Sequence, residues 1–122
     1  MNDLIGLSYG WGHRPGDGSG RTDCFQLVCE VRRRLGLRDY GKTFEWVYSR
    51  YSDETFPRRL LMRWLRQYGR PLAEPTPGAV TWLPGNALGT CTGWGVVFIA
   101  TGQNVVHAPV PTGLARCFWM DE

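Results

Sequence analysis

The sequence predicts an α+β domain in which N-terminal helices pack on a small antiparallel β-sheet. Apolar residues recur at helical spacing as far as Tyr68. Beyond Pro75 they form short β-rich runs separated by Gly and Pro. Helices followed by strands are typical of the α+β class. The chain has 122 residues and no long linker, which indicates a single domain over residues 1–122.

The first helix is expected directly after a glycine-rich segment. Residues 10–20 contain many glycines and predict a long turn that follows a short extended piece. Asp23 suits the N-cap position, and Gly36 supplies the stop. The apolar stripe between them comprises Cys24, Val28, Val31 and Leu35. This spacing places Cys24 in the first turn, on the side that faces the core.

Two further helices and four strands complete the predicted fold. A short helix is expected over Phe44–Tyr51 and a longer one over Pro57–Tyr68, ended by Gly69. The predicted strands are Ala79–Leu83, Trp94–Ala100, Asn104–Ala108 and Leu114–Trp119. A hairpin turn over residues 101–103 joins the two middle strands, so the strands form an antiparallel meander.

The composition excludes some classes of function. The net charge is only +3, from 14 Lys and Arg against 11 Asp and Glu, so nucleic acid is not an expected partner. The run Arg32–Arg34 is interpreted as a solvated helix face. The first ten residues contain neither a basic segment nor a long apolar stretch, so no signal peptide or membrane span is expected. Six Trp, five Tyr and five Phe suit either a tight core or a stacking surface for a polymeric ligand.

The cysteines are interpreted as thiols. Their spacing shows no C-x-x-C pair, and a chain of this length folds without disulfides. Nothing in the spacing supports a zinc site with His13 or His107, so neither a metal nor an organic cofactor is expected. The four cysteines are Cys24, Cys29, Cys91 and Cys117.

Cys24 is the candidate nucleophile. Unpaired N–H groups and the positive dipole end at a helix start stabilise thiolate over thiol. The alternative is that Cys24 is a small buried apolar residue.

Several segments resemble the NlpC-type family of cell-wall cysteine peptidases, which have a papain-like fold. The stretch SYGWGHRPGDGSGRTDCFQLV resembles the family's Tyr-x-Trp-Gly segment, glycine-rich turn and Asp-Cys nucleophile motif. PGAVTWL resembles the strand that follows the helical half of the family's domains, and GWGVVFIATGQNVVHAP resembles the hairpin that carries the base histidine. The segment from Leu37 to Glu74 matches least. Four motifs in the family's order make the resemblance specific.

The resemblance implies a site around Cys24. It assigns Cys24 as the nucleophile, Tyr9 as the neighbouring tyrosine and His107 as the third polar residue. The family's base histidine falls on Trp94, which cannot accept a proton. The resemblance also places further side chains at or near the cleft, namely Trp11, His13 and Asp23.

Three interpretations of the missing base stay open. In the first, His107 acts alone as base and then acid, because adjacent strands lie about 5 Å apart. In the second, His13 reaches the thiol from the glycine-rich loop. In the third, catalysis is lost and the domain binds or assembles.

The bulky Phe25-Gln26 pair after the cysteine is similar to the tail-assembly branch of the family in phages and prophages. That branch implies a virion protein of the tail tip, made in the host cytoplasm. If active, it would hydrolyse amide bonds in peptidoglycan peptide stems. If inactive, it would be a structural component that binds other tail-tip or baseplate proteins.

Overall fold

The computed structural model describes residues 1–85, 87–110 and 116–121. Within these ranges the chain forms a short 3-10 helix, three α-helices and eight β-strands. The helices are η1 (Asn2–Leu4), α1 (Cys24–Arg34), α2 (Trp46–Arg50) and α3 (Arg59–Tyr68). The strands are β1 (Ser8–Tyr9), β2 (Arg21–Thr22), β3 (Gly69–Leu72), β4 (Val80–Leu83), β5 (Ala87–Cys91), β6 (Val96–Ile99), β7 (Val106–Ala108) and β8 (Arg116–Met120).

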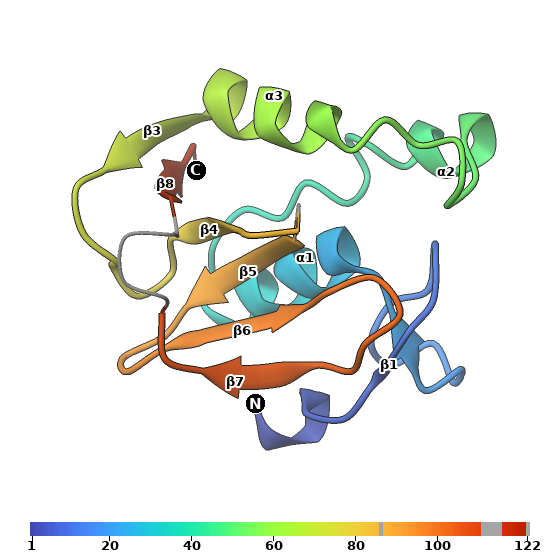
Figure 1. Cartoon of the computed structure of the whole chain (residues 1–122), viewed down its shortest axis with the longest axis horizontal. Helices are drawn as coiled ribbons and strands as arrows, with labels where there is room; N and C mark the ends of the chain where they lie inside the picture. Colours follow the sequence, from blue (N-terminus) through green and yellow to red (C-terminus); the bar gives the residue numbers. More distant parts are fainter. Residues whose placement is uncertain (86, 111–115, 122) are drawn as a thin grey trace.

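In the described part of the chain, six strands form one antiparallel sheet in the order β3-β8-β4-β5-β6-β7. Strands β4 to β7 follow one another as a meander, which includes β5, a strand that was not predicted. Strand β8 departs from this pattern because it returns to lie between β3 and β4 (Figure 1). The strands β1 and β2 form a separate parallel pair beside the sheet. The α+β class predicted from the sequence is therefore confirmed.

Helix α1 begins at the predicted cap and covers the middle of the sheet. The Asp23 Oδ1 atom accepts a hydrogen bond from the Gln26 N–H at 2.8 Å, which satisfies one of the free donors at the helix start. The helix packs on β5 and β6, and Figure 1 shows it behind these strands. Leu27, Val28 and Val31 are fully buried in this contact, so the apolar stripe fixes the helix on the sheet.

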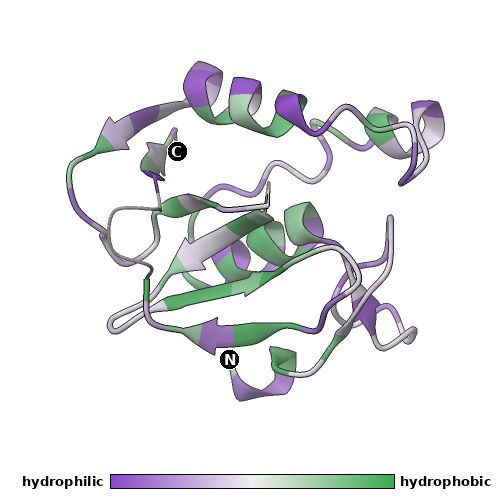
Figure 2. Cartoon of the chain, in the orientation of Figure 1, coloured by the Kyte–Doolittle hydropathy of each residue, from purple (hydrophilic) through white to green (hydrophobic). Residues whose placement is uncertain are grey.

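The segment containing α2 and α3 closes the other side of α1. Helix α3 contacts β3 and β8 and buries Leu61, Trp64 and Leu65 against the core. Its opposite side is polar, and Figure 2 shows this helix divided into hydrophilic and hydrophobic sides. None of the helices in the described residues is both long and apolar enough to cross a membrane.

The predicted helices are confirmed, but two strands of the six-stranded sheet were not predicted. Strand β5 contains Gly89, and every one of its residues is buried, so it lacks the alternating pattern of a half-buried strand. A Cβ atom at Gly89 would lie 2.6 Å from the Val96 Cγ2 atom, so close packing excludes a side chain there. Strand β3 contains Pro71 and forms at the sheet edge, where a proline is tolerated. The first two residues of the predicted strand Leu114–Trp119 lie outside the described residues.

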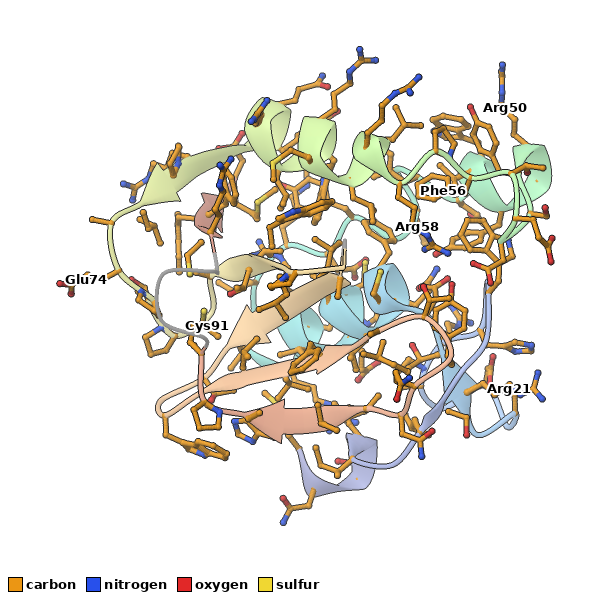
Figure 3. The ribbon with its side chains drawn as sticks, in the orientation of Figure 1. Arg21, Arg50, Phe56, Arg58, Glu74 and Cys91 are labelled. Atoms are coloured by element: carbon orange, nitrogen blue, oxygen red, sulfur yellow. The ribbon has the colours of Figure 1, made fainter. Side chains whose placement is uncertain are left out.

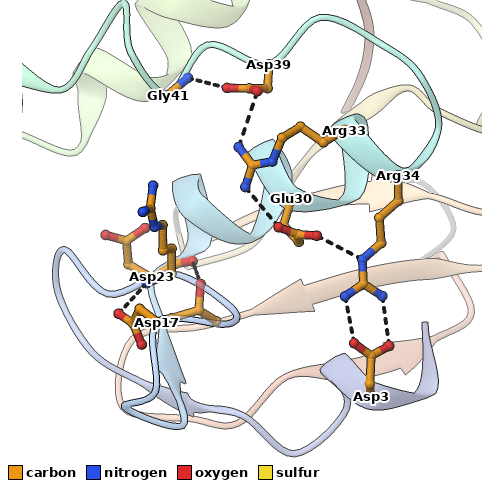
Figure 4. A network of polar contacts seen from close by, with 10 residues as sticks. Asp3, Asp17, Asp23, Glu30, Arg33, Arg34, Asp39 and Gly41 are labelled. Carbon is orange, nitrogen blue, oxygen red and sulfur yellow. Dashed lines mark hydrogen bonds and ion pairs between the residues drawn. The ribbon is translucent and has the colours of Figure 1, made fainter.

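The prediction of a solvated face for Arg32–Arg34 is wrong for its first residue. Arg32 is buried, and its Nε donates to the Arg38 carbonyl oxygen at 2.6 Å. Arg33 and Arg34 both bind Glu30, and Arg34 makes two further bonds to the Asp3 carboxylate (Figure 4). These contacts tie the end of α1 to the N-terminal segment.

Candidate functional site

Cys24 lies at the first position of α1, with its side chain against the sheet. The side chain is only 7% exposed. The main chain of Leu88, near the start of β5, lies beside the thiol. The predicted placement of the cysteine, at the helix start and facing the sheet, is therefore confirmed.

The surroundings of Cys24 favour the thiol and not the thiolate. Burial, together with the nearby Asp23 carboxylate, raises the pKa of this thiol from its ordinary value of 9.0 to about 12. The main chain of Leu88 and the positive charge of Arg58 lower the pKa, but they do not offset the burial. At this position desolvation therefore outweighs the stabilisation of a thiolate that a helix start provides.

Asp23 has a structural role beside the thiol. Its Oδ1 atom caps α1, and its Oδ2 atom accepts a hydrogen bond from the Gly12 N–H at 2.9 Å. Burial raises the pKa of this carboxyl, and these two backbone hydrogen bonds and one from Tyr48 oppose the rise. Asp23 therefore joins the glycine-rich loop to the helix start, and each of its carboxylate oxygens accepts a backbone hydrogen bond.

Tyr9 belongs to a polar cluster on the same side of the molecule. Its hydroxyl donates to the Asp53 Oδ1 atom at 2.6 Å, and Arg58 bonds to both of these residues. Burial and the hydrogen bond to Asp53 raise the pKa of Tyr9 to about 12. Figure 3 shows Arg58 between the segment joining α2 to α3 and the start of α1. The cluster thus fastens this segment over the cysteine end of α1.

An aromatic cavity lies over Cys24, between α1 and the segment that contains α2 and α3. Its volume is about 240 Å³. Trp11 lines it and contacts Tyr48 and Phe56 with ring centroids 4.9 and 5.2 Å apart. The remaining lining residues are Asp23, Cys24, Phe25, Phe44, Trp46, Val47, Arg58, Leu60, Leu61, Arg63, Trp64, Gln67 and Tyr68. Trp11 and Asp23 are therefore at the cysteine, as the resemblance implied.

The structure places His107 and Trp94 together at a different position. His107 lies in β7, and its Nε2 atom is hydrogen-bonded to the Thr92 Oγ1 atom at 2.7 Å. The Trp94 ring stacks on the imidazole with centroids 3.9 Å apart, and Trp94 is 62% exposed. Thr92 follows the end of β5, whereas the Cys24 thiol contacts Leu88 near its start.

The predicted pairing of Cys24 with His107 is not formed. Val97 in β6 pairs with both Thr90 and His107, so His107 is two strands away from β5. At about 4.8 Å per strand and 3.4 Å per residue, the main chain at His107 is roughly 12 Å from Leu88. The imidazole also points toward Thr92, which is farther from Leu88 along the chain.

In the described residues, neither strand β5 nor His13 supplies a base in place of His107. Strand β5, which lies against the thiol, consists of Ala87, Leu88, Gly89, Thr90 and Cys91 and carries neither an imidazole nor a carboxylate. His13 does not line the cavity, and its Nδ1 atom is 3.0 Å from the Asp17 Oδ2 atom in the glycine-rich loop. Each histidine is therefore bonded to a neighbour other than the Cys24 thiol, His107 to Thr92 and His13 to Asp17.

The sequence analysis missed the residues that close the site. Phe44, Tyr48, Phe56 and Arg58 all line the cavity, and all come from the segment that least resembled the family. The density of aromatic residues over 44–68 was the available signal. That signal indicated a core or a stacking surface and could not place a cavity over Cys24.

All four cysteines are free and buried. Across the described residues, no group of three or more His, Cys, Asp or Glu side chains is arranged to hold a metal ion. Cys91 and Cys117 lie 3.9 Å apart at their sulfur atoms, with the Thr81 hydroxyl 2.8 Å from Cys91. Comparison with known proteins found no matching family model, no matching curated protein and no matching solved structure.

Proposed function

We propose that this chain is an NlpC-like domain that has lost catalysis and serves as a binding and assembly component of a phage tail tip or baseplate. The observation that carries the proposal is the state of Cys24. The thiol is buried at the helix start, and the adjacent strand has no side chain that would accept its proton. The domain keeps the position of a nucleophile without the chemistry that a nucleophile needs.

The NlpC-like part of the proposal is supported by the arrangement of helix and sheet. A cysteine at the start of the first long helix packs against an antiparallel sheet, and an aspartate directly before it caps the helix. A glycine-rich loop and Tyr9 precede this helix, in the order that the resemblance implied. The phage part of the proposal depends on the resemblance of the Phe25-Gln26 pair.

The loss of catalysis is supported by the requirements of a cysteine peptidase. The attacking group must be a thiolate, and the leaving amine must receive a proton from a neighbouring acid. With a pKa of about 12, Cys24 is almost entirely protonated at neutral pH. His107 would have to break its bond to Thr92 and reach from β7 past β6 to the sulfur.

A digestion assay tests this proposal. Purified peptidoglycan is incubated at neutral pH with the wild-type protein, with Cys24→Ala and with His107→Ala, and released stem peptides are measured by mass spectrometry. We expect equal background release from all three proteins. Release by the wild type that disappears in both variants would show a working dyad and would overturn the proposal.

A further inference from the structure

The size of the cavity over Cys24 indicates what fits it. At about 240 Å³ it exceeds the volume of about 150 Å³ that accommodates benzene. It is smaller than the roughly 300 to 1,000 Å³ of sites for drug-sized ligands. Its walls are mostly aromatic, with Phe25, Phe44 and Phe56 among them. A single large apolar side chain matches this volume and lining.

The wall of the cavity contains a hydrogen-bond donor without an acceptor. Trp64 is 6% exposed, and its Nε1 atom has no hydrogen-bond partner among the described residues. A buried donor in this state destabilises the free protein. The Nε1 atom itself is buried, so this unpaired donor lies within the wall and is not exposed to the cavity.

A second hollow continues from the cavity along the outer side of α3. Its volume is about 480 Å³, and it shares Leu60, Arg63 and Gln67 with the cavity. The other residues that line it are Arg59, Met62 and Arg66. An extended chain anchored in the cavity would thus continue over a surface formed by α3.

This surface is strongly basic. Arg59, Arg63 and Arg66 are exposed, and none of them forms an ion pair with a described residue. Asp53 is already paired with Arg58, which lines the cavity. The rise from residue 59 to 63 in a helix is about 6 Å, close to the roughly 7 Å between alternate residues of an extended chain. Acidic side chains at alternate positions would therefore meet successive arginines.

We infer that the cavity over Cys24 and the arginine surface of α3 together bind an acidic, extended segment of a partner protein, with one large apolar side chain inserted in the cavity. This inference rests on the proposed function, because it specifies the chemistry of the assembly partner. Aromatic and arginine side chains commonly provide the main binding energy at protein interfaces. The exposed Trp46 at the cavity would cover the inserted side chain.

The observations favour a protein segment over a membrane or nucleic acid. A helix that lies in a lipid interface must present an apolar face, and the apolar face of α3 is buried against the core. A nucleic acid duplex would contact the arginines but keep its bases stacked in its interior, away from the aromatic cavity. An acidic polypeptide with an apolar side chain uses both halves of the surface.

Fluorescence anisotropy with a designed peptide tests the inference. The probe is a short fluorescein-labelled peptide with one tryptophan followed by glutamates at alternate positions. We expect binding to the wild-type protein that weakens at least tenfold when the glutamates become glutamines, and a similar loss when the tryptophan becomes serine. No binding at about 1 mM probe would overturn the inference. Equal binding of the glutamine or the serine peptide would also overturn it.

Matched variants locate the site. Arg63→Glu with Arg66→Glu should weaken binding at least tenfold. Arg14→Glu with Arg21→Glu changes the net charge equally at two exposed positions that line neither the cavity nor the second hollow, and should leave binding within about twofold. Trp46→Ala, at a half-exposed position, tests the cavity and should also weaken binding at least tenfold. Equal loss in both charge variants would overturn the inference, as would unchanged binding by Trp46→Ala. Thermal unfolding confirms that each variant is folded.

Two competing ligands complete the experiment. A short DNA duplex and vesicles containing phosphatidylserine are measured with the same variants. Binding of either ligand, sensitive to Arg63 and Arg66 and tighter than that of the acidic peptide, would overturn the choice of a protein partner. The outcome is separate from the digestion assay, since peptide binding does not depend on whether Cys24 is catalytic. Failure here with no peptidoglycan digestion would leave the proposed function in place.

Discussion

The two ends of strand β5 have opposite surroundings. Near its start, Leu88 contacts a thiol that is buried under an aromatic cavity. Beyond its end, Thr92 holds an imidazole that stacks on an exposed tryptophan. A cysteine peptidase needs the thiol and the imidazole in contact. Here the two groups lie at opposite ends of β5. Residues that complete a motif in the sequence can therefore be held apart by a strand that the motif does not reveal.

The largest expected effect concerns the reactivity of Cys24. A pKa raised from 9.0 to about 12 lowers the thiolate fraction at pH 7.5 about 1,000-fold. Because the folded-state pKa is raised, the rate of alkylation should increase about tenfold per pH unit and reach no plateau below about pH 11. Iodoacetamide labelling, resolved by mass spectrometry of the peptide that contains Cys24, measures this rate.

The denatured protein is the control for this measurement, because its thiols are exposed and unshifted. Rapid labelling of Cys24 in the folded protein at pH 7, with a labelling rate that levels off near neutral pH, would contradict a buried thiol with a raised pKa. It would mean that a base reaches the sulfur.

The next effect concerns the strand that separates the two regions. Replacing Gly89 by alanine puts a Cβ atom 2.6 Å from the Val96 Cγ2 atom and 3.0 Å from the Val97 carbonyl oxygen. We expect a loss of about 3 kcal/mol in the free energy of unfolding, as for overpacked cores. Urea denaturation measures it. Gly93→Ala is the matched control, since its Cβ would meet no atom within 4 Å, and similar losses in both variants would contradict the account of β5.

A smaller effect is expected at the cap of α1. Asp23→Ala removes the acceptor for Gln26 and leaves the Gly12 N–H without its partner. The loss of a cap and of a buried acceptor should lower the free energy of unfolding by about 2 kcal/mol. Asp23→Asn keeps one oxygen and should show an intermediate value in the same denaturation experiment. An unchanged midpoint in Asp23→Ala would show that the loop and the helix are not joined through this carboxylate.

The smallest effect is expected at the far end of β5. Thr92→Val removes the bond to His107 and the acceptor for the Gly95 N–H, and should lower stability by about 1 kcal/mol. Because this position is remote from Cys24, the labelling rate of Cys24 should not change. A changed rate would show that the two ends of the strand are coupled.

Most of the fold could be predicted from local patterns. The apolar stripe and the cap determined α1, and Gly69 marked the end of α3 as expected. Strands β4, β6 and β7 follow their β-rich runs. Strand β5 escaped prediction because burial on both faces removes alternation and because small residues were selected by packing against β6. The need for small residues depends on neighbours in another strand, so the sequence of β5 alone does not indicate it.

The site was predicted only in part. The position of Cys24 follows from helix capping, which is local. Its burial depends on how the segment with α2 and α3 folds over it, and this segment is fastened by the contacts among Tyr9, Asp53 and Arg58, residues far apart in the sequence. The pairing with His107 failed because the unpredicted strand β5 moved the histidine hairpin one strand farther from the helix.

The return of β8 to a position between β3 and β4 has a consequence for folding during synthesis. Strand β3 pairs with β8, and β8 also pairs with β4, so β8 joins the α3–β3 unit to the meander. During synthesis, β3 and β4 each have an unpaired strand edge until residues 116–120 have left the ribosome. Contacts between such distant parts of the chain slow folding. Chaperones that shield exposed strand edges should therefore increase the yield of this protein more than that of a simple meander.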